Sequence, residues 1–167
     1  MLEIQIDVSG DDVLERGYCI VAAKSDIKSY FGFKFDEKLV RALKKNYETG
    51  KYHYGLSKTG KIYFKIRVYC IIVSILVKLM MKENKSTNAG LYICRDFDGH
   101  KEDIEMNLKS ILRDINITGF LYDTLPKESA ADILAYLLNK GKRIKGKKFD
   151  RNRIAHISLS DIEKHIK

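Results

Sequence analysis

The fold is decided by the stretch Leu91-Tyr92-Ile93-Cys94-Arg95-Asp96-Phe97-Asp98-Gly99-His100. Its first four residues form a continuous apolar run, which is typical of a strand buried on both faces. The stretch then turns polar, so that two carboxylates and an imidazole stand where a strand passes into a helix. If Asp96 and Asp98 are both extended, the two-residue period of a strand puts them on one face. Open α/β sheets carry their sites at the carboxyl ends of strands, and we therefore expect a functional site here.

Downstream of this stretch the pattern predicts a helix, a strand and a second helix. From Glu102 onward, apolar residues recur at helical spacing and predict an amphipathic helix against the sheet. The short apolar run Gly119–Asp123 predicts a strand that ends in a carboxylate. Pro126 helps to open the next helix, and Gly141 closes it. Such strand–helix–strand units demand parallel strands with right-handed crossovers.

Upstream, the chain predicts a hairpin followed by an apolar helix. Leu2–Val8 alternates apolar and polar residues, and Gly17–Ala23 predicts a second strand. The segment Lys61–Val68 also alternates, so it is either a third strand that closes a meander, with a buried helix over Tyr69–Met81, or the start of one helix over Lys61–Lys82. Together with the downstream units, this order predicts a mixed sheet in which the first strand is central and parallel to the strand at Leu91.

Length and composition describe one globular domain over residues 1–167. With 45% hydrophobic and 32% charged residues, a chain of this length buries roughly 70% of its unfolded surface. The three cysteines lie far apart in apolar runs, which predicts free thiols rather than a disulfide framework or a zinc site. No signal peptide opens the chain, and the apolar run Val68–Leu79 is shorter than the ~20 residues of a membrane span. We therefore expect a cytoplasmic protein and a core helix.

The net charge of +9 suits a polyanionic partner, nucleic acid above all. The densest positive run lies between Lys140 and Lys148. We expect any nucleic-acid affinity to be carried there by five cations: Lys142, Arg143, Lys145, Lys147 and Lys148. The alternative is that this run is simply a solvated loop.

Three carboxylates, Asp7, Asp96 and Asp123, each end a predicted strand, and these strands would be neighbours. Carboxylates that converge in this way cannot all stay ionised without a cation between them. Mg²⁺ or Mn²⁺, which prefer oxygen ligands, would fit, with Asp98 or His100 completing the shell. His100 would otherwise act as acid or base. The alternative is that these residues cap helices and turns, as Asp98 would for the helix from Glu102.

The order of elements, from the hairpin that begins Ile6-Asp7-Val8-Ser9-Gly10 to the fourth strand that Asp96 ends, resembles the ribonuclease H-like fold. This α/β fold is a mixed five-stranded sheet with helices on both faces. The chain also resembles uncharacterised archaeal proteins that carry a domain of unknown function. The resemblance implies that Asp7 and Asp96, which match an aspartate on the family's first strand and one ending its fourth, hold two Mg²⁺ ions with further acidic residues.

The chain departs from that family at two positions. The apolar helix over Tyr69–Met81 lacks the family's helical glutamate, and Glu83 lies at its far end. The family's last acidic residue would be Asp150 or Asp161. Fold alone does not give function.

The leading functional hypothesis is a Mg²⁺- or Mn²⁺-dependent nuclease or phosphotransferase that acts on nucleic acid, with Asp7, Asp96, Asp98 and His100 in its active site. The alternative is a non-catalytic nucleic-acid-binding or interaction module of the same fold. A structural or dimerisation protein would be favoured if the surface of Val68–Met81 were exposed. Neither glycine signature of a Rossmann or P-loop enzyme occurs.

Overall fold

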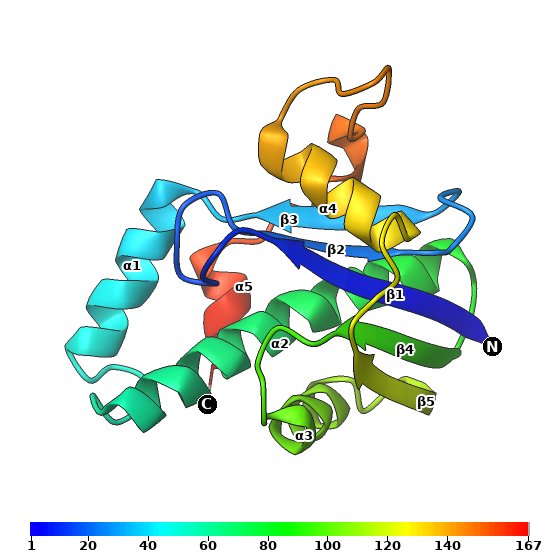
Figure 1. The fold of residues 1–167 in the computed structure, drawn as a ribbon. Coiled ribbons are helices and arrows are strands. Elements are labelled where there is room, and N and C mark those ends of the chain that lie inside the picture. The colour runs from blue at the N-terminus through cyan, green and yellow to red at the C-terminus, as the bar shows by residue number, and fades with distance from the viewer. Residues whose placement is uncertain (167) are drawn as a thin grey trace.

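A five-stranded mixed sheet forms the centre of the protein (Figure 1). The computed structural model describes residues 1–166. The strands are β1 (Leu2–Ser9), β2 (Cys19–Ala23), β3 (Tyr30–Lys34), β4 (Asn88–Cys94) and β5 (Asn116–Asp123). They lie in the order β3-β2-β1-β4-β5, with antiparallel pairs from β3 to β1 and parallel pairs from β1 to β5. The predictions of an α/β fold and of a central β1 beside a parallel β4 are confirmed.

Helices cover both faces of this sheet (Figure 1). The core on one face is formed by α1 (Glu37–Glu48), α2 (Lys58–Glu83), α3 (Lys101–Ile111) and α5 (Leu159–Glu163). The other face is covered by α4 (Ala130–Lys140), which packs on β1, β2 and β3. A short 3-10 helix, η1 (Arg151–Arg153), follows on the same side, and its neighbours Phe149 and Ile154 join the core beneath α4.

The third strand differs from the sequence prediction. It is Tyr30–Lys34, whereas Lys61–Val68 belongs to the single long helix α2, the second of the two alternatives. Gly32 interrupts the apolar pattern of the true strand, because there is no room for a side chain at this position. A Cβ at Gly32 would lie 2.7 Å from atoms of both Leu138 and Phe149. The close packing of α4 on β3 therefore requires a glycine at this position. The same glycine breaks the apolar pattern by which the strand could have been predicted.

The helix α2 is the principal core element. Ser57 caps its first turn by accepting a hydrogen bond from the amide of Gly60. Most of Val68–Met81 is buried within the chain, so the exposed surface that a dimerisation protein would need there is not present. Within residues 1–166, no helix combines the length and the apolar character needed to cross a membrane. The three cysteines are free, with Cys19 and Cys70 buried and Cys94 half-buried, as expected.

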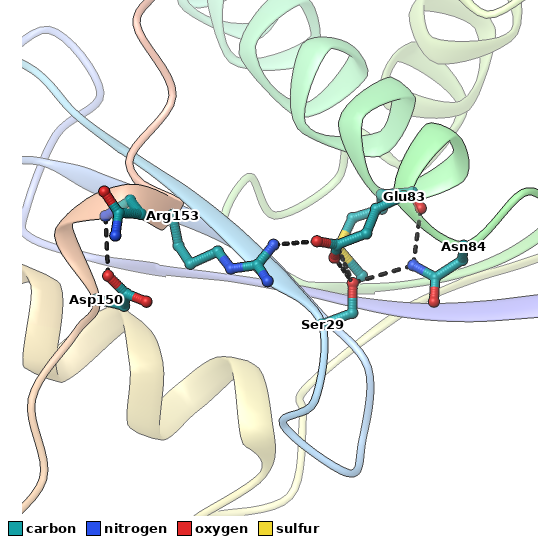
Figure 2. A network of polar contacts seen from close by, with 7 residues as sticks. Ser29, Glu83, Asn84, Asp150 and Arg153 are labelled. Atoms are coloured by element: carbon teal, nitrogen blue, oxygen red, sulfur yellow. Dashed lines mark hydrogen bonds and ion pairs between the residues drawn. The ribbon is translucent and has the colours of Figure 1, made fainter.

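A polar network ties the C-terminal segment to the sheet (Figure 2). Glu83, the last residue of α2, accepts a hydrogen bond from Ser29 and forms an ion pair with Arg153. Asn84 donates to the Ser29 hydroxyl at 3.0 Å. The backbone amide of Ala155 then donates to the carbonyl of Gly32 at 2.7 Å, so the returning chain lies along the edge of β3. The segment around η1 is thus fixed on the sheet.

Candidate functional site

One end of the sheet gathers most of the predicted site residues. The strands β1, β4 and β5 run parallel as neighbours, so their carboxyl ends meet at this end of the sheet. Asp7 lies near the end of β1, Asp96 follows β4, and Asp123 ends β5. The antiparallel pairing of Ser9 with Cys19, and of Cys19 with Lys34, brings the last residue of β3 to the same end.

Asp7 is the buried member of the group, with 6% of its surface exposed. Burial raises the pKa of its carboxyl, and the negative charges of Asp132 and Asp96 raise it further. Two hydrogen bonds oppose this rise: one from the backbone amide of Val8, at 2.8 Å, and one with the thiol of Cys94. Burial in turn raises the pKa of the Cys94 thiol to about 11. Asp7 is therefore a carboxyl whose ionised form the fold disfavours.

Asp96 has a different hydrogen-bond partner from Asp7. The hydroxyl of Tyr18, in the loop ahead of β2, donates to its Oδ2 atom at 2.5 Å. Asp96 is exposed as a residue, but partial burial of its carboxyl raises the pKa of this group. The Tyr18 hydrogen bond lowers that pKa, and the charge of Asp12 raises it. Asp12 itself pairs with Lys65 of α2 at 2.5 Å. The charge of Asp96 thus raises the pKa of Asp7, but the two carboxyls have separate hydrogen-bond partners.

Two further tyrosines surround the chain that follows β4. The hydroxyl of Tyr122 accepts from the amide of Phe97 at 2.6 Å and donates to its carbonyl at 2.8 Å. The ring of Tyr69, on α2, packs edge-on against Phe97, and its buried hydroxyl has no hydrogen-bond partner in the described part of the chain. The charge of Asp96 contributes to the raised pKa of both phenols, although burial is the largest cause. These tyrosines fix the backbone directly after Asp96.

The other predicted ligands are engaged elsewhere. Asp98 has a side chain 88% exposed and pairs with Arg95 at 3.1 Å. His100 is the N-cap residue directly before α3, and its Nδ1 atom lies 2.9 Å from the carboxylate of Asp103. Asp123 is exposed and accepts a hydrogen bond from the amide of Thr124 at 2.7 Å. The alternative role of Asp98, as the cap of the helix from Glu102, is also wrong, because α3 has no side-chain cap.

The positions of these acidic side chains decide whether the protein can bind Mg²⁺ or Mn²⁺ at this end of the sheet. Residues 1–166 contain no group of three or more His, Cys, Asp or Glu side chains placed to hold a metal ion. One oxygen of Asp96 is already bound by Tyr18. Of the two candidates for a last acidic ligand, Asp150 caps η1, and Asp161 completes a capping box with Ser158 at the start of α5. As arranged, the donor set does not fit a two-ion centre.

Sequence reasoning missed Asp132, which lies in the first turn of α4 near enough to Asp7 for its charge to matter. Its position after Ser129, the cap of α4, is typical of an acidic residue that only stabilises a helix N-terminus. Tyr18 and Tyr69 were missed because both stand in apolar runs and resemble ordinary core residues. Only the three-dimensional arrangement shows that they approach Asp96.

The basic run is an ordered turn rather than a free tail. Ile144 and Lys147 exchange two backbone hydrogen bonds of 2.8 and 2.9 Å, and Lys145 and Gly146 between them both have positive φ. Positive φ at both central positions is characteristic of a tight type I′ turn. The side chain of Ile144 packs on the core beneath α4. The five cations are therefore presented on a fixed loop, here called the basic loop (residues 142–148).

The basic loop divides its cations between two sides. Lys145 and Lys147 line a hollow beside α4 that also contains Glu128 and Asp132. Lys142 and Lys148 line a second pocket with no acidic residue among the described lining. Comparison with family models, with curated proteins and with solved structures finds no match for this chain.

Proposed function

We propose that the protein has a ribonuclease H-like fold and acts as a non-catalytic nucleic-acid-binding module. The fold proposal is supported by the strand order β3-β2-β1-β4-β5, with an antiparallel meander first and two parallel strands after it, and by helices on both faces. This arrangement agrees with what the sequence resemblance implies.

The observation that carries the binding proposal is the fixed basic loop. All five of its cations are exposed, and none has a carboxylate within 4.0 Å among residues 1–166. Phosphate contacts by such cations release counterions and supply most of the sequence-independent affinity for nucleic acid. The net charge of +9 acts in the same direction.

The second candidate is the Mg²⁺- or Mn²⁺-dependent nuclease or phosphotransferase. It is favoured by one observation, namely that the charges of Asp96 and Asp132 both raise the pKa of Asp7, so three carboxylates lie in one neighbourhood. It is disfavoured by the incomplete donor set and by the engagement of Asp96 with Tyr18. Binding without catalysis is therefore the better-supported function.

The test measures binding of the full chain to labelled duplex DNA and single-stranded RNA by fluorescence anisotropy over a series of salt concentrations. A triple variant, Lys142→Gln, Lys145→Gln and Lys148→Gln, removes three phosphate contacts, so the salt dependence on duplex DNA should flatten by about 2.7 log units per log unit of salt. The matched control removes the same charge from exposed positions on α1, by Lys38→Gln, Lys44→Gln and Lys45→Gln. An equal effect of both triple variants, or no binding at low salt, would overturn the proposal.

A separate measurement distinguishes the second candidate. Thermal unfolding is followed with and without Mn²⁺ for the wild-type chain and for Asp7→Asn, because an ion that binds only the folded state raises the melting temperature. The binding module predicts no increase that depends on Asp7 and no cleavage of either nucleic acid. An Mn²⁺-dependent increase that Asp7→Asn abolishes would support the nuclease instead.

A further inference from the structure

A small basic pocket lies where α4 ends against β3 and the chain returns from the basic loop. Its volume is about 190 Å³. Its floor is apolar and contains Leu137, Leu138, Phe149 and Ile154. Its charged lining consists of four cations from three segments, β3, the basic loop and η1: Lys34, Lys142, Lys148 and Arg151. We refer to it as the four-cation pocket.

Within residues 1–166, the charges of this pocket are not neutralised by any carboxylate. In the described part of the chain, no carboxylate lies within ion-pair distance of any of the four cations. Lys34 donates to the carbonyls of Leu138 and Asn139, at 3.3 and 3.0 Å, and the third donor of its ammonium group has no partner among the described residues. The nearest acidic residue in sequence, Asp150, is committed to capping η1 through the amide of Asn152.

The walls of the pocket are fixed by packing. Phe149 lies against Gly32 and contacts the ring of Tyr30 edge-on, with 5.1 Å between ring centroids. Gly141 ends α4 in the left-handed conformation, at φ 67°. The ion pair of Arg153 with Glu83 holds η1, which begins at Arg151 (Figure 2). The backbone that carries the four cations is therefore already ordered, so binding avoids the ordering cost that a mobile tail would carry.

We propose that the four-cation pocket binds the terminal phosphate of a nucleic-acid strand, a proposal that rests on the nucleic-acid-binding function above. Its volume is below the ~300 Å³ at which sites for whole small molecules begin, so it suits a phosphate group rather than a nucleoside. An internal phosphodiester carries a single charge, whereas a terminal phosphate monoester carries about −1.5 to −2 at pH 7. Four unneutralised cations match the terminal group better.

The hollow on the other side of the basic loop provides the contrast. There Lys145 and Lys147 share the lining with Glu128 and Asp132, so an incoming phosphate would meet two negative charges. Two lysines of the basic loop, Lys142 and Lys148, thus line a pocket without carboxylates, whereas Lys145 and Lys147 line a hollow with two. The geometry assigns recognition of the strand end to the four-cation pocket and only general attraction to Lys145 and Lys147.

The test uses the full chain and one internally labelled single-stranded oligonucleotide prepared with a 5′-phosphate, with a 3′-phosphate, or with hydroxyl groups at both ends. Charge-assisted hydrogen bonds to a terminal phosphate should make one phosphorylated form bind about tenfold tighter than the hydroxyl form. Lys142→Gln with Lys148→Gln should abolish this preference. Lys145→Gln with Lys147→Gln should weaken the binding of all three forms and keep the preference.

The outcomes separate the two proposals. Equal affinity for phosphorylated and hydroxyl ends overturns the terminal-phosphate assignment and leaves nucleic-acid binding intact. Equal loss of preference in both double variants overturns the assignment too, because general charge would then explain the effect. Absence of binding to every form at low salt overturns the nucleic-acid-binding function itself. Circular dichroism of each variant verifies that it is folded, and Arg151→Gln gives an independent second test of the pocket.

Discussion

Tyr18 donates its hydroxyl hydrogen to Oδ2 of Asp96 across 2.5 Å, and this bond joins the loop ahead of β2 to the end of β4. Tyr18→Phe keeps the ring but removes the donor, and the free energy of unfolding at neutral pH should fall by about 1–3 kcal/mol. Because this bond lowers the pKa of Asp96, the loss should shrink in acid, where Asp96 is protonated. Denaturant titrations at two pH values measure both effects.

The control for this substitution is Tyr63→Phe, which removes a hydroxyl from an exposed position on α2. It should change the free energy of unfolding little at either pH. A loss at Tyr18→Phe that does not depend on pH would show that the ring contacts, and not the hydrogen bond to Asp96, had been disturbed.

Asp7→Asn should stabilise the protein at neutral pH. Burial and two neighbouring negative charges raise the folded-state pKa of Asp7 above its unfolded value, so ionisation of this carboxyl opposes folding at high pH. This destabilisation disappears as the pH falls through the pKa of Asp7 in the folded state toward its pKa in the unfolded state. The difference between variant and wild-type free energies of unfolding should therefore be positive at pH 7 and decline in acid. Asp123→Asn, at an exposed strand end, should show no comparable gain.

Gly32→Ala should destabilise the fold by about 1–3 kcal/mol, the range found for overpacked cores. The added methyl group would lie 2.7 Å from Leu138 and from Phe149, and both side chains are buried. Gly119→Ala, on β5, is the matched control, because its Cβ would meet only an ordinary contact of 3.9 Å. Thermal unfolding of the two variants measures the difference, and equal melting temperatures would contradict the close approach of α4 to β3.

Glu83→Gln should lower the free energy of unfolding at neutral pH by roughly 1–3 kcal/mol, since it removes the charge that Ser29 and Arg153 both contact. The hydrogen bond from Ser29 and that from Arg153 depress the pKa of Glu83 below its ordinary value of 4.5. The contribution of Glu83 to the free energy of unfolding is therefore present above its pKa in the unfolded state. It is lost as the pH falls through its pKa in the folded state. Glu48→Gln, at an exposed position on α1, serves as the control, and a loss that persisted undiminished in strong acid would refute this account.

Strong local patterns predicted most of the sheet correctly. The alternation of Leu2–Val8 and the apolar run at Leu91 identified β1 and β4, and the neighbouring positions of their ends followed from the order of elements. The end of α4 at Gly141 was also visible in the sequence. These features depend on short-range chemistry, which a sequence displays directly.

The errors have a common physical origin in contacts between distant segments. Gly32 weakens the apparent strand at β3 because α4 packs against it from more than a hundred residues away. The engagement of Asp96 by Tyr18, and the approach of Asp132 to Asp7, depend on how three elements meet at the end of the sheet. A pattern of residue types can place carboxylates at strand ends, but it does not reveal which other groups occupy the space around them.

The attachment of the returning chain to β3 and α2 has a consequence for limited proteolysis. The exposed basic loop offers trypsin several adjacent cleavage sites, whereas the segment beyond it is held by contacts that do not depend on chain continuity. These contacts are the backbone bond from Ala155 to Gly32, the ion pair of Arg153 with Glu83, and hydrogen bonds from Tyr54 and Arg67 to carbonyls near the C-terminus. A chain nicked between residues 142 and 148 should therefore elute from a sizing column as one particle and separate into two fragments only in denaturant. The C-terminal segment would then behave as a fragment that complements the rest of the domain.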